Sequence, residues 1–391
     1  MARGQPTSAT SGSLEELLSA KEIVICCGSG GVGKTTTAAA AGAMAAIHLG
    51  GKVLVVTVDP ARRLANALGL EAFGNVETRV PDEAFADAGV EPRGELWAAM
   101  LDTKQSWDDL VHRHAPDAET RDAIRANPLY TNITGRFVQS HDYIAMERLY
   151  EIHTSGRYDL VIVDTPPTRN AIDFLEAPER MADFFSSRLL RWLTVPYRSR
   201  LVNAATRPFY RIADTILGSA FLEDIAEFFL LFQTMYDGFV ERARAVQRTL
   251  EDKRTTFVVV STLESAPVRE AEYFMEALDD DGYHLGAIVF NKVLPNYLLD
   301  TKAAKAAKAM AERPDEIAAA LPERLGDPSD VARVVDEVGN SFLNFRVVAA
   351  RESEQRKELA AQPDVIASVP YFDADIHDLA GLLRLGEQLW S

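Results

Sequence analysis

A glycine-rich run near the start of the chain constrains the fold more than any other feature. Residues 28–36 read GSGGVGKTT, directly after the apolar run Ile23–Cys27 and directly before an alanine-rich stretch. The segment from Gly28 to Thr35 meets the spacing G-x-x-x-x-G-K-[ST] of a phosphate-binding loop. This order of patterns predicts a strand, a phosphate loop and the start of a helix.

The residue types in this loop fit a nucleoside triphosphate. Glycines let successive backbone N–H groups converge on one phosphate, and the following helix adds unpaired N–H groups and its positive dipole end. We expect Lys34 to act in catalysis by reaching the β- and γ-phosphates, and the Thr35 hydroxyl to ligate Mg²⁺. The alternative, a chance glycine-rich turn, is disfavoured by the flanking strand and helix signals. The residues expected to contact ATP are Gly28, Gly30, Gly31, Val32, Gly33, Lys34, Thr35 and Thr36.

The composition narrows the class of protein. The formal net charge of the 391 residues is −17, so no nucleic-acid partner is expected, because a polyanion would be repelled. Residues 1–13 are polar and lack an apolar signal region, and no apolar segment approaches the length of a membrane span. We therefore expect a cytoplasmic protein with a flexible N-terminus.

The adjacent Cys26 and Cys27 offer no disulfide framework and no C-x-x-C metal site, and we expect both to be buried.

Short apolar runs alternate with helical patterns, which is typical of a mostly parallel sheet covered by helices on both faces. We therefore predict an α/β P-loop nucleoside-triphosphatase fold, formed as a single domain over residues 14–391. A small-residue helix is predicted over Thr35–Leu49. The predicted strands are Ile23–Cys27, Lys52–Val58, Leu96–Leu101, Leu160–Val163, Thr256–Ser261, Ala287–Phe290 and Val365–Val369.

Two long stretches carry helical patterns in place of strands. Residues 103–250, interrupted by the strand at 160–163, predict a helical subdomain inserted into the core. A second stretch, Thr301–Glu358, is alanine-rich and charged and is broken by three prolines. We expect this second stretch to pack against the core or against the insert.

Three polar residues at the ends of predicted strands are candidates for the nucleotide site. Asp59 is placed to orient an attacking water, although Asp followed by proline is also a common helix start. Asp164 has the form of a Walker B carboxylate that supports Mg²⁺ through a water or through Thr35, and the alternative is a cap of the next turn. The amide of Asn291 would read the adenine edge with a donor and an acceptor, or it forms a turn.

Together these segments resemble the deviant-Walker ATPases of the MinD, ParA and ArsA class. Within that class the chain is most similar to the ArsA family of anion-transporter ATPases and their relatives that target tail-anchored membrane proteins. The resemblance implies an ATP-dependent dimer, with Asp59 in switch I, Asp164 and Thr168 in switch II, and the residues near Pro370 close to the adenine. It is carried by Gly28–Thr37, Val58–Gly69, Val163–Arg169, Phe290–Lys292 and Val369–Leu382.

The chain departs from the family pattern in two ways. Ser29 stands where the family has a signature lysine that reaches the phosphates across the dimer, so a cation worth roughly several kcal/mol in the transition state is missing. The missing cation would be replaced within the chain by Arg62, Arg63 or Arg169, or supplied by a homodimeric or paralogous partner. Alternatively, hydrolysis is slow. The chain also lacks the C-x-x-C zinc site of the targeting branch and the separated cysteines of an arsenite site, which argues against arsenite transport.

Two segments of the helical insert are candidate partner surfaces. Phe184–Ala213 contains six arginines and no acidic residue, which fits an acidic partner, an anionic membrane surface or a paralogous subunit, or else a solvated helical face. Residues 221–239 form a dense apolar helix, which is more typical of a core but would suit a hydrophobic client helix if exposed.

From these features we expect an ATP-binding and ATP-hydrolysing dimeric switch. The nucleotide state would rearrange a helical subdomain that binds a partner or client. The alternatives are an ATP-sensing module with little turnover, which Ser29 keeps open, and a MinD/ParA-like positioning ATPase, which the large insert disfavours.

Overall fold

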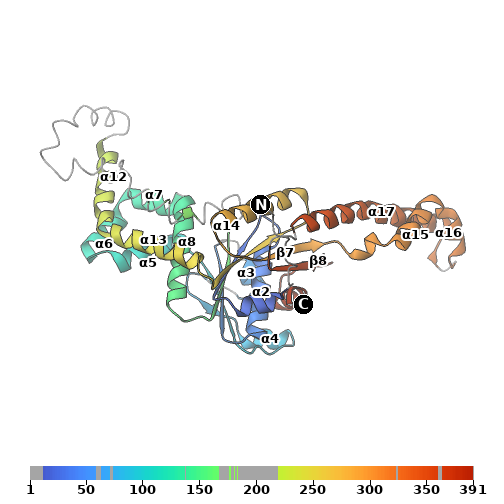
Figure 1. Ribbon diagram of the computed structural model, residues 1–391, viewed down its shortest axis with the longest axis horizontal. Coiled ribbons are helices and arrows are strands. Elements are labelled where there is room, and N and C mark those ends of the chain that lie inside the picture. The colour runs from blue at the N-terminus through green and yellow to red at the C-terminus, as the bar shows by residue number, and fades with distance from the viewer. Residues whose placement is uncertain are drawn as a thin grey trace, which may run out of the picture.

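The computed structural model places an eight-stranded sheet at the centre of the molecule, in the order β3-β4-β2-β5-β1-β6-β7-β8 (Figure 1). The structure describes residues 12–58, 63–70, 74–136, 138–166, 219–322, 325–359 and 363–390, with residues 176, 177, 180 and 183. The strands are β1 (Ile23–Cys27), β2 (Lys52–Thr57), β3 (Thr78–Arg79), β4 (Glu95–Met100), β5 (Leu160–Asp164), β6 (Thr255–Ser261), β7 (Leu285–Val293) and β8 (Val365–Pro370).

The sheet confirms the predicted α/β fold with mostly parallel strands. All seven predicted strands are present, and neighbouring strands are parallel except for the antiparallel pair of β3 and β4. The two-residue β3 was not predicted because it is too short to carry an alternating pattern. Five of the strands are almost completely buried, as is typical of a parallel sheet covered on both faces.

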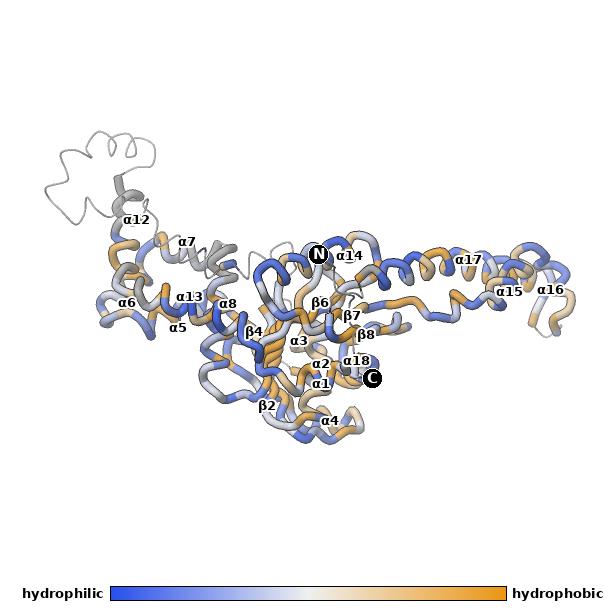
Figure 2. The backbone as a smooth tube through the Cα atoms, viewed as in Figure 1, coloured by the Kyte–Doolittle hydropathy of each residue, from blue (hydrophilic) through white to orange (hydrophobic). Residues whose placement is uncertain are grey.

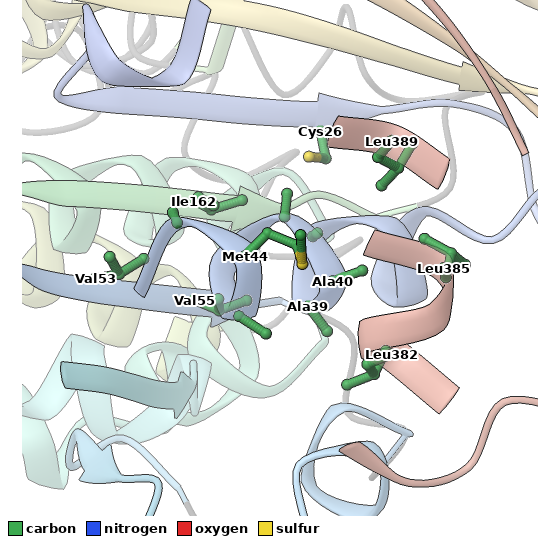
Figure 3. Close-up of a cluster of buried hydrophobic side chains, with 14 of the residues drawn as sticks. Cys26, Ala39, Ala40, Met44, Val53, Val55, Ile162, Leu382, Leu385 and Leu389 are labelled. Carbon is green, nitrogen blue, oxygen red and sulfur yellow. The ribbon is translucent and has the colours of Figure 1, made fainter. Parts of the chain in front are cut away.

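One face of the sheet is covered by a helix of small residues and by leucine-rich helices that pack around it. Helix α2 (Lys34–His48) lies between the sheet and α18 (Leu379–Trp390), and Figure 3 shows Met44 in the cluster that joins them. A Cβ at Gly42 of α2 would collide with Val55 of β2, so the helix approaches the sheet closely. The same core includes side chains from α1 (Leu14–Ser19), α3 (Arg63–Ala67) and α4 (Asp82–Asp87).

The opposite face is covered by longer helices, two of which also belong to the helical subdomain. Helices α8 (Val138–Thr154), α13 (Tyr236–Leu250) and α14 (Ser265–Asp280) bury apolar side chains against the strands. Because α8 and α13 each continue beyond the sheet, they join the central core to the subdomain (Figure 1).

The helical subdomain has an aromatic core of its own. The buried rings come from α5, α8, α12 and α13, and they include Trp107, Tyr143, Phe228, Phe232 and Phe239. Ring centroids of neighbouring pairs are 5.0–6.3 Å apart. The described part of the apolar stripe at 221–239 is therefore core in this structure. The remaining elements are α5 (Thr103–His114), α6 (Ala118–Ala126), α7 (Pro128–Arg136), α12 (Ser219–Phe232) and η2 (Gln233–Met235).

A buried ion pair crosses this aromatic core. The Glu147 side chain on α8 is 1% exposed, and its carboxylate lies 2.6 Å from Arg242 Nε on α13. Tyr143 Oη donates a hydrogen bond of 2.8 Å to the same carboxylate. Burial raises the pKa of Glu147, while Arg242 and Tyr143 oppose that shift. The pair fixes the relative position of α8 and α13 inside the subdomain.

The second helical stretch forms a hairpin arm that projects away from the core at the opposite end of the molecule (Figures 1 and 2). The expectation that it packs against the core or the insert is wrong for most of its length. Near the core, Leu359 is buried against the sheet and Glu352 accepts a hydrogen bond of 3.0 Å from Leu294 N. The arm consists of η3 (Asn296–Leu299), α15 (Thr301–Glu312), α16 (Pro314–Ala320) and α17 (Pro328–Leu359).

Among the described helices, none combines the length and the apolar character that a membrane span requires.

Candidate nucleotide site

The glycine-rich loop connects β1 to α2 at the carboxyl edge of the sheet. Gly33 is the N-cap of α2 with a φ of 96°, a left-handed conformation that favours glycine. A Cβ at Gly33 would also collide with the side chain of Asn291, and a Cβ at Gly28 would collide with the carbonyl oxygen of Val260. The loop therefore needs glycine at these two positions, both for backbone conformation and for close packing.

The loop lysine is buried beneath the loop. Lys34 is 7% exposed, and its ammonium donates a hydrogen bond of 2.9 Å to the carbonyl oxygen of Ser29. Because Lys34 is the first residue of α2, its charge adds to the positive end of the helix dipole. The combination of lysine, glycine loop and helix N-terminus is suited to polyphosphate.

A carboxylate lies directly below the loop. Asp164 Oδ2 accepts hydrogen bonds from Thr35 Oγ1 at 2.6 Å and from Thr57 Oγ1 at 2.9 Å. The strand register explains this meeting, because β5 lies between β1 and β2 and Asp164 is paired with Cys26 on one side and with Thr57 on the other. Hydroxyl and carboxylate oxygens are the hard donors that Mg²⁺ prefers, so Thr35 and Asp164 fit this ion.

A cavity of about 540 Å³ opens above the loop. Its volume is in the range of small-molecule sites. Gly28, Val32 and Asp164 are not on its wall and instead support the loop from below. The predicted residues that line it are Gly30, Gly31, Gly33, Lys34, Thr35, Thr36, Asn291 and Pro370.

Asn291 braces the loop. Its Nδ2 donates to the carbonyl oxygen of Val32 at 2.8 Å, and its Oδ1 accepts from the backbone N–H of Lys292 at 2.9 Å. Lys292 has a φ of 59°, a conformation that is uncommon for a residue other than glycine and that clusters at functional sites. Contact of Asn291 with the adenine edge remains a prediction. The bracing role was not predicted, because nothing in the sequence relates Asn291 to Val32.

The wall opposite the loop is largely apolar and aromatic. Tyr371, Phe372 and Ile376 line it beside Pro370, after the end of β8, and Leu385 of α18 joins them. Flat aromatic and apolar groups suit the face of a nucleobase. Asp375 is a carboxylate on the same wall. Of these residues only Pro370 was predicted individually; the resemblance over Val369–Leu382 implied that its neighbours lie close to the adenine.

Several predicted residues lie outside the described part of the chain. These are Asp59, Thr168, Arg62 and Arg169, together with the basic segment Phe184–Ala213. Arg63 is the first residue of α3, and its side chain is not among those described.

Ser29 stands where the resemblance predicts a lysine. Ser29 is 8% exposed, so its side chain points into the protein. Within the described residues its Oγ has no hydrogen-bond partner. Among the residues that the structure describes, the lysines that line the cavity are Lys34 and Lys292.

Both cysteines lie on β1 beneath the loop and are 1% exposed. Burial raises the pKa of the Cys27 thiol to about 12. Burial and then the charge of Asp164 raise the pKa of the Cys26 thiol well above its usual range. Both thiols are therefore protonated at neutral pH and act as small apolar core residues.

A glycine loop and helix N-terminus at the carboxyl edge of a parallel sheet, with a lysine and a strand-end aspartate, define a P-loop nucleotide-binding protein. A family model described as anion-transporting ATPase matches residues 21–319. The match covers more than half of the chain, and the chain belongs to this family of ATPases. Helix α17 lies beyond the matched segment.

Proposed function

We propose that this chain binds ATP with Mg²⁺ and hydrolyses it as a dimer, and that the nucleotide state rearranges the helical subdomain. The observation that carries the proposal is the contact of Asp164 with Thr35 and Thr57. Thr35 and Asp164 are 129 residues apart in the sequence and are linked by a hydrogen bond of 2.6 Å directly below the phosphate loop.

Each part of the site has a role in this proposal. The loop N–H groups and Lys34 bind the β- and γ-phosphates, and Thr35 and Asp164 hold Mg²⁺, which supplies positive charge where negative charge accumulates in phosphoryl transfer. On binding, the Lys34 ammonium exchanges the Ser29 carbonyl for phosphate oxygens. Asp59 orients the attacking water, as its position after β2 in the sequence suggests.

The connections between the sheet and the helices support coupling of the nucleotide site to the helical subdomain. Strand β4 ends at the carboxyl edge of the sheet, and Asp102, two residues later, caps α5 by accepting from Gln105 N at 2.8 Å. The amide oxygen of Asn75 accepts from Asp102 N at 3.3 Å and from Ser106 Oγ at 3.1 Å. A shift at this edge of the sheet is therefore transmitted to the first helix of the subdomain.

A client helix would bind only in another state of the subdomain. Phe228, Phe232 and Phe239 are 2% exposed here, so their surface is used by the subdomain itself. We propose that ATP binding separates helices of this cluster and exposes part of it. The alternative surface, for an acidic partner or an anionic membrane, is the basic segment Phe184–Ala213.

A second candidate function is an ATP sensor with little turnover. The buried Ser29 favours it, because the loop presents no cation at that position. In this case ATP would bind and shift the subdomain without being consumed.

Loss of the loop lysine tests the site. In Lys34→Ala we expect ATP turnover to fall by about 10²–10³-fold, the usual cost of removing one positioned charge from a transition state. Lys308→Ala is the matched control, because Lys308 lies on the arm with a side chain that is 67% exposed. Unchanged turnover in Lys34→Ala would show that hydrolysis does not occur at this loop.

Hydrogen exchange tests the coupling. We expect ATP with Mg²⁺ to change the exchange of amides in α5, α8, α12 and α13 in the native chain, and to leave Lys34→Ala unchanged. Identical exchange with and without nucleotide, at saturating ATP, would contradict the rearrangement. A change in exchange without turnover would favour the sensor.

A further inference from the structure

The hairpin arm is built with small residues inside. The side chains buried between its helices are Ala304, Ala307, Ala318, Ala332, Val335 and Ala349. At Gly339 of α17 the two helices approach so closely that a Cβ would lie 2.6 Å from the carbonyl oxygen of Ala307. A seam of alanines buries little apolar surface, so it contributes little stabilisation per turn.

Several of the larger apolar side chains of α17 lie on the outside, whereas Val335 is buried and Phe342 and Leu343 are half-buried. Val334, Val338, Phe345 and Val348 are 45–54% exposed. Together with Val331 and Ser341 they recur at alternating intervals of three and four residues, which is the a/d pattern of a coiled-coil seam. We call these six residues the outer seam. Figure 2 shows apolar segments recurring along α17 where it runs away from the core.

Charges are sparse along the middle of α17, and the two halves of the helix differ in the sign of their net charge. From Val338 to Ala350 the sole charged residue is Arg346. The tip half of α17, residues 328–343, has three carboxylates and Arg333, for a net charge of −2. The half near the core, residues 344–359, has four cations and three carboxylates, for a net charge of +1. Two such helices in antiparallel orientation would place the net-negative half of each beside the net-positive half of the other.

We propose that the outer seam is a self-association surface that takes α17 of a second copy of this chain, antiparallel, across a two-fold axis between Gly339 and Asn340. In this register each a position meets a d position of the partner, as knobs-into-holes packing requires. Val331 faces Val348, Val334 faces Phe345, and Val338 faces Ser341. The same register brings Asp330 to Arg351, both of which flank the seam at g positions.

The geometry of the arm suits pairing with α17 of a second copy of the chain. Helix α17 has 32 residues and is about 48 Å long, and the outer part of the arm stands clear of the core (Figure 1). An isologous pair uses the same surface on both copies, so a self-complementary pattern on one helix is sufficient. The outer seam lies away from the phosphate loop, so its pairing needs no contact with nucleotide.

Sedimentation of charge variants in the seam tests the proposal. In a Lys34→Ala background without nucleotide, we expect Phe345→Glu to lower the mass about twofold at tens of micromolar chain, because it places a carboxylate in the seam. Val347→Glu is the matched control, since Val347 is 55% exposed on the same helix but lies at a c position. Equal masses for Phe345→Glu and its parent, or an equal effect of Val347→Glu, would overturn the proposal.

Cross-linking tests the orientation. A variant that carries both Asp330→Cys and Arg351→Cys cannot join them within one chain by a short bismaleimide, because they lie about 31 Å apart along the helix. Both native thiols are buried, so the reaction reports the introduced ones. We expect cross-linked dimers for the double variant and none for either single variant. Cross-linking of the single variants would indicate parallel helices, and its absence in all three would exclude pairing.

Discussion

The two helical appendages of this protein place their bulky apolar residues in opposite ways. In the helical subdomain the large rings point inward, and Phe228, Phe232 and Phe239 are 2% exposed. In the hairpin arm alanines point inward, while Val334, Val338 and Phe345 are at least half exposed. Both are α-helical, and they lie at opposite ends of the same sheet (Figure 1).

This difference shows which appendage buries enough of its own apolar surface to be stable without a partner. A helix is stabilised mainly by the apolar face that it buries, so an element with its large residues inside does not need a partner to be stable. The subdomain meets this condition in the present structure. The arm meets it only in part, and several of its larger side chains are available to another surface.

The largest expected effect concerns the aromatic core of the subdomain. We expect Phe232→Ala to lower the free energy of unfolding of the subdomain by about 3–5 kcal/mol, because it leaves a cavity in a packed cluster. Hydrogen exchange of α12 and α13 amides measures this change. A loss below about 1 kcal/mol would mean that the cluster is loosely packed and would remove the contrast with the arm.

An effect of similar size is expected at the buried ion pair. Arg242→Met leaves the Glu147 carboxylate buried without its cation, which typically costs about 3–5 kcal/mol. Burial raises the pKa of Glu147 in the folded state above its unfolded value, and loss of Arg242 removes a charge that opposes this shift. In Arg242→Met the stability associated with protonated Glu147 is therefore present at low pH. It is lost as the pH rises through the pKa that Glu147 has in the folded state.

Denaturation of Arg242→Met across pH 5 to 8 checks this reasoning. The destabilisation relative to the native chain should grow as the pH rises. The double variant Arg242→Met/Glu147→Gln should remove most of that pH dependence. A pH-independent loss in Arg242→Met would show that Glu147 does not carry the buried charge.

A smaller effect is expected where α15 and α17 of the arm pack against each other. Gly339→Val would force α15 and α17 apart where a Cβ meets the backbone of Ala307, at a cost of about 1–3 kcal/mol. Asn340→Ala is the control, since Asn340 is the exposed next residue. Hydrogen exchange of α15 distinguishes the two variants, and equal protection would mean that the helices are not in close contact there.

The smallest effect is expected on the outside of the arm. In dilute solution, where arms are unpaired, Phe345→Ala should change the free energy of unfolding by less than about 0.5 kcal/mol, as exposed substitutions usually do. Chemical denaturation beside Phe232→Ala measures the contrast directly. A loss of several kcal/mol would place Phe345 in the core of its own chain.

Local patterns in the sequence predicted the parts of the fold that depend on neighbouring residues. The phosphate loop, the seven longer strands and the breaks of the second helical stretch at its prolines follow from periodicity and from glycine and proline chemistry. The proximity of Thr57 to Asp164 depends on the placement of β5 between β1 and β2, which no local pattern encodes. The bracing of Val32 by Asn291 depends in the same way on tertiary structure.

The prediction that the second helical stretch packs against the core or the insert was wrong for a physical reason. An alanine-rich, charged helical pattern is compatible with packing on a sheet, as the alanines of α2 show. In α15 the same small residues instead let two helices approach each other at Gly339. The a/d spacing of Val334, Val338, Ser341 and Phe345 was the available signal that α17 has a second apolar face.

The most direct test of this account is Mg²⁺-dependent ATP hydrolysis measured against protein concentration for the native chain and for Asp59→Asn. The account predicts a specific activity that rises with concentration, because the active form is a dimer, and that collapses in the variant. Tight ATP binding without turnover at any concentration would contradict hydrolysis by this chain alone and would favour an ATP sensor or a missing partner.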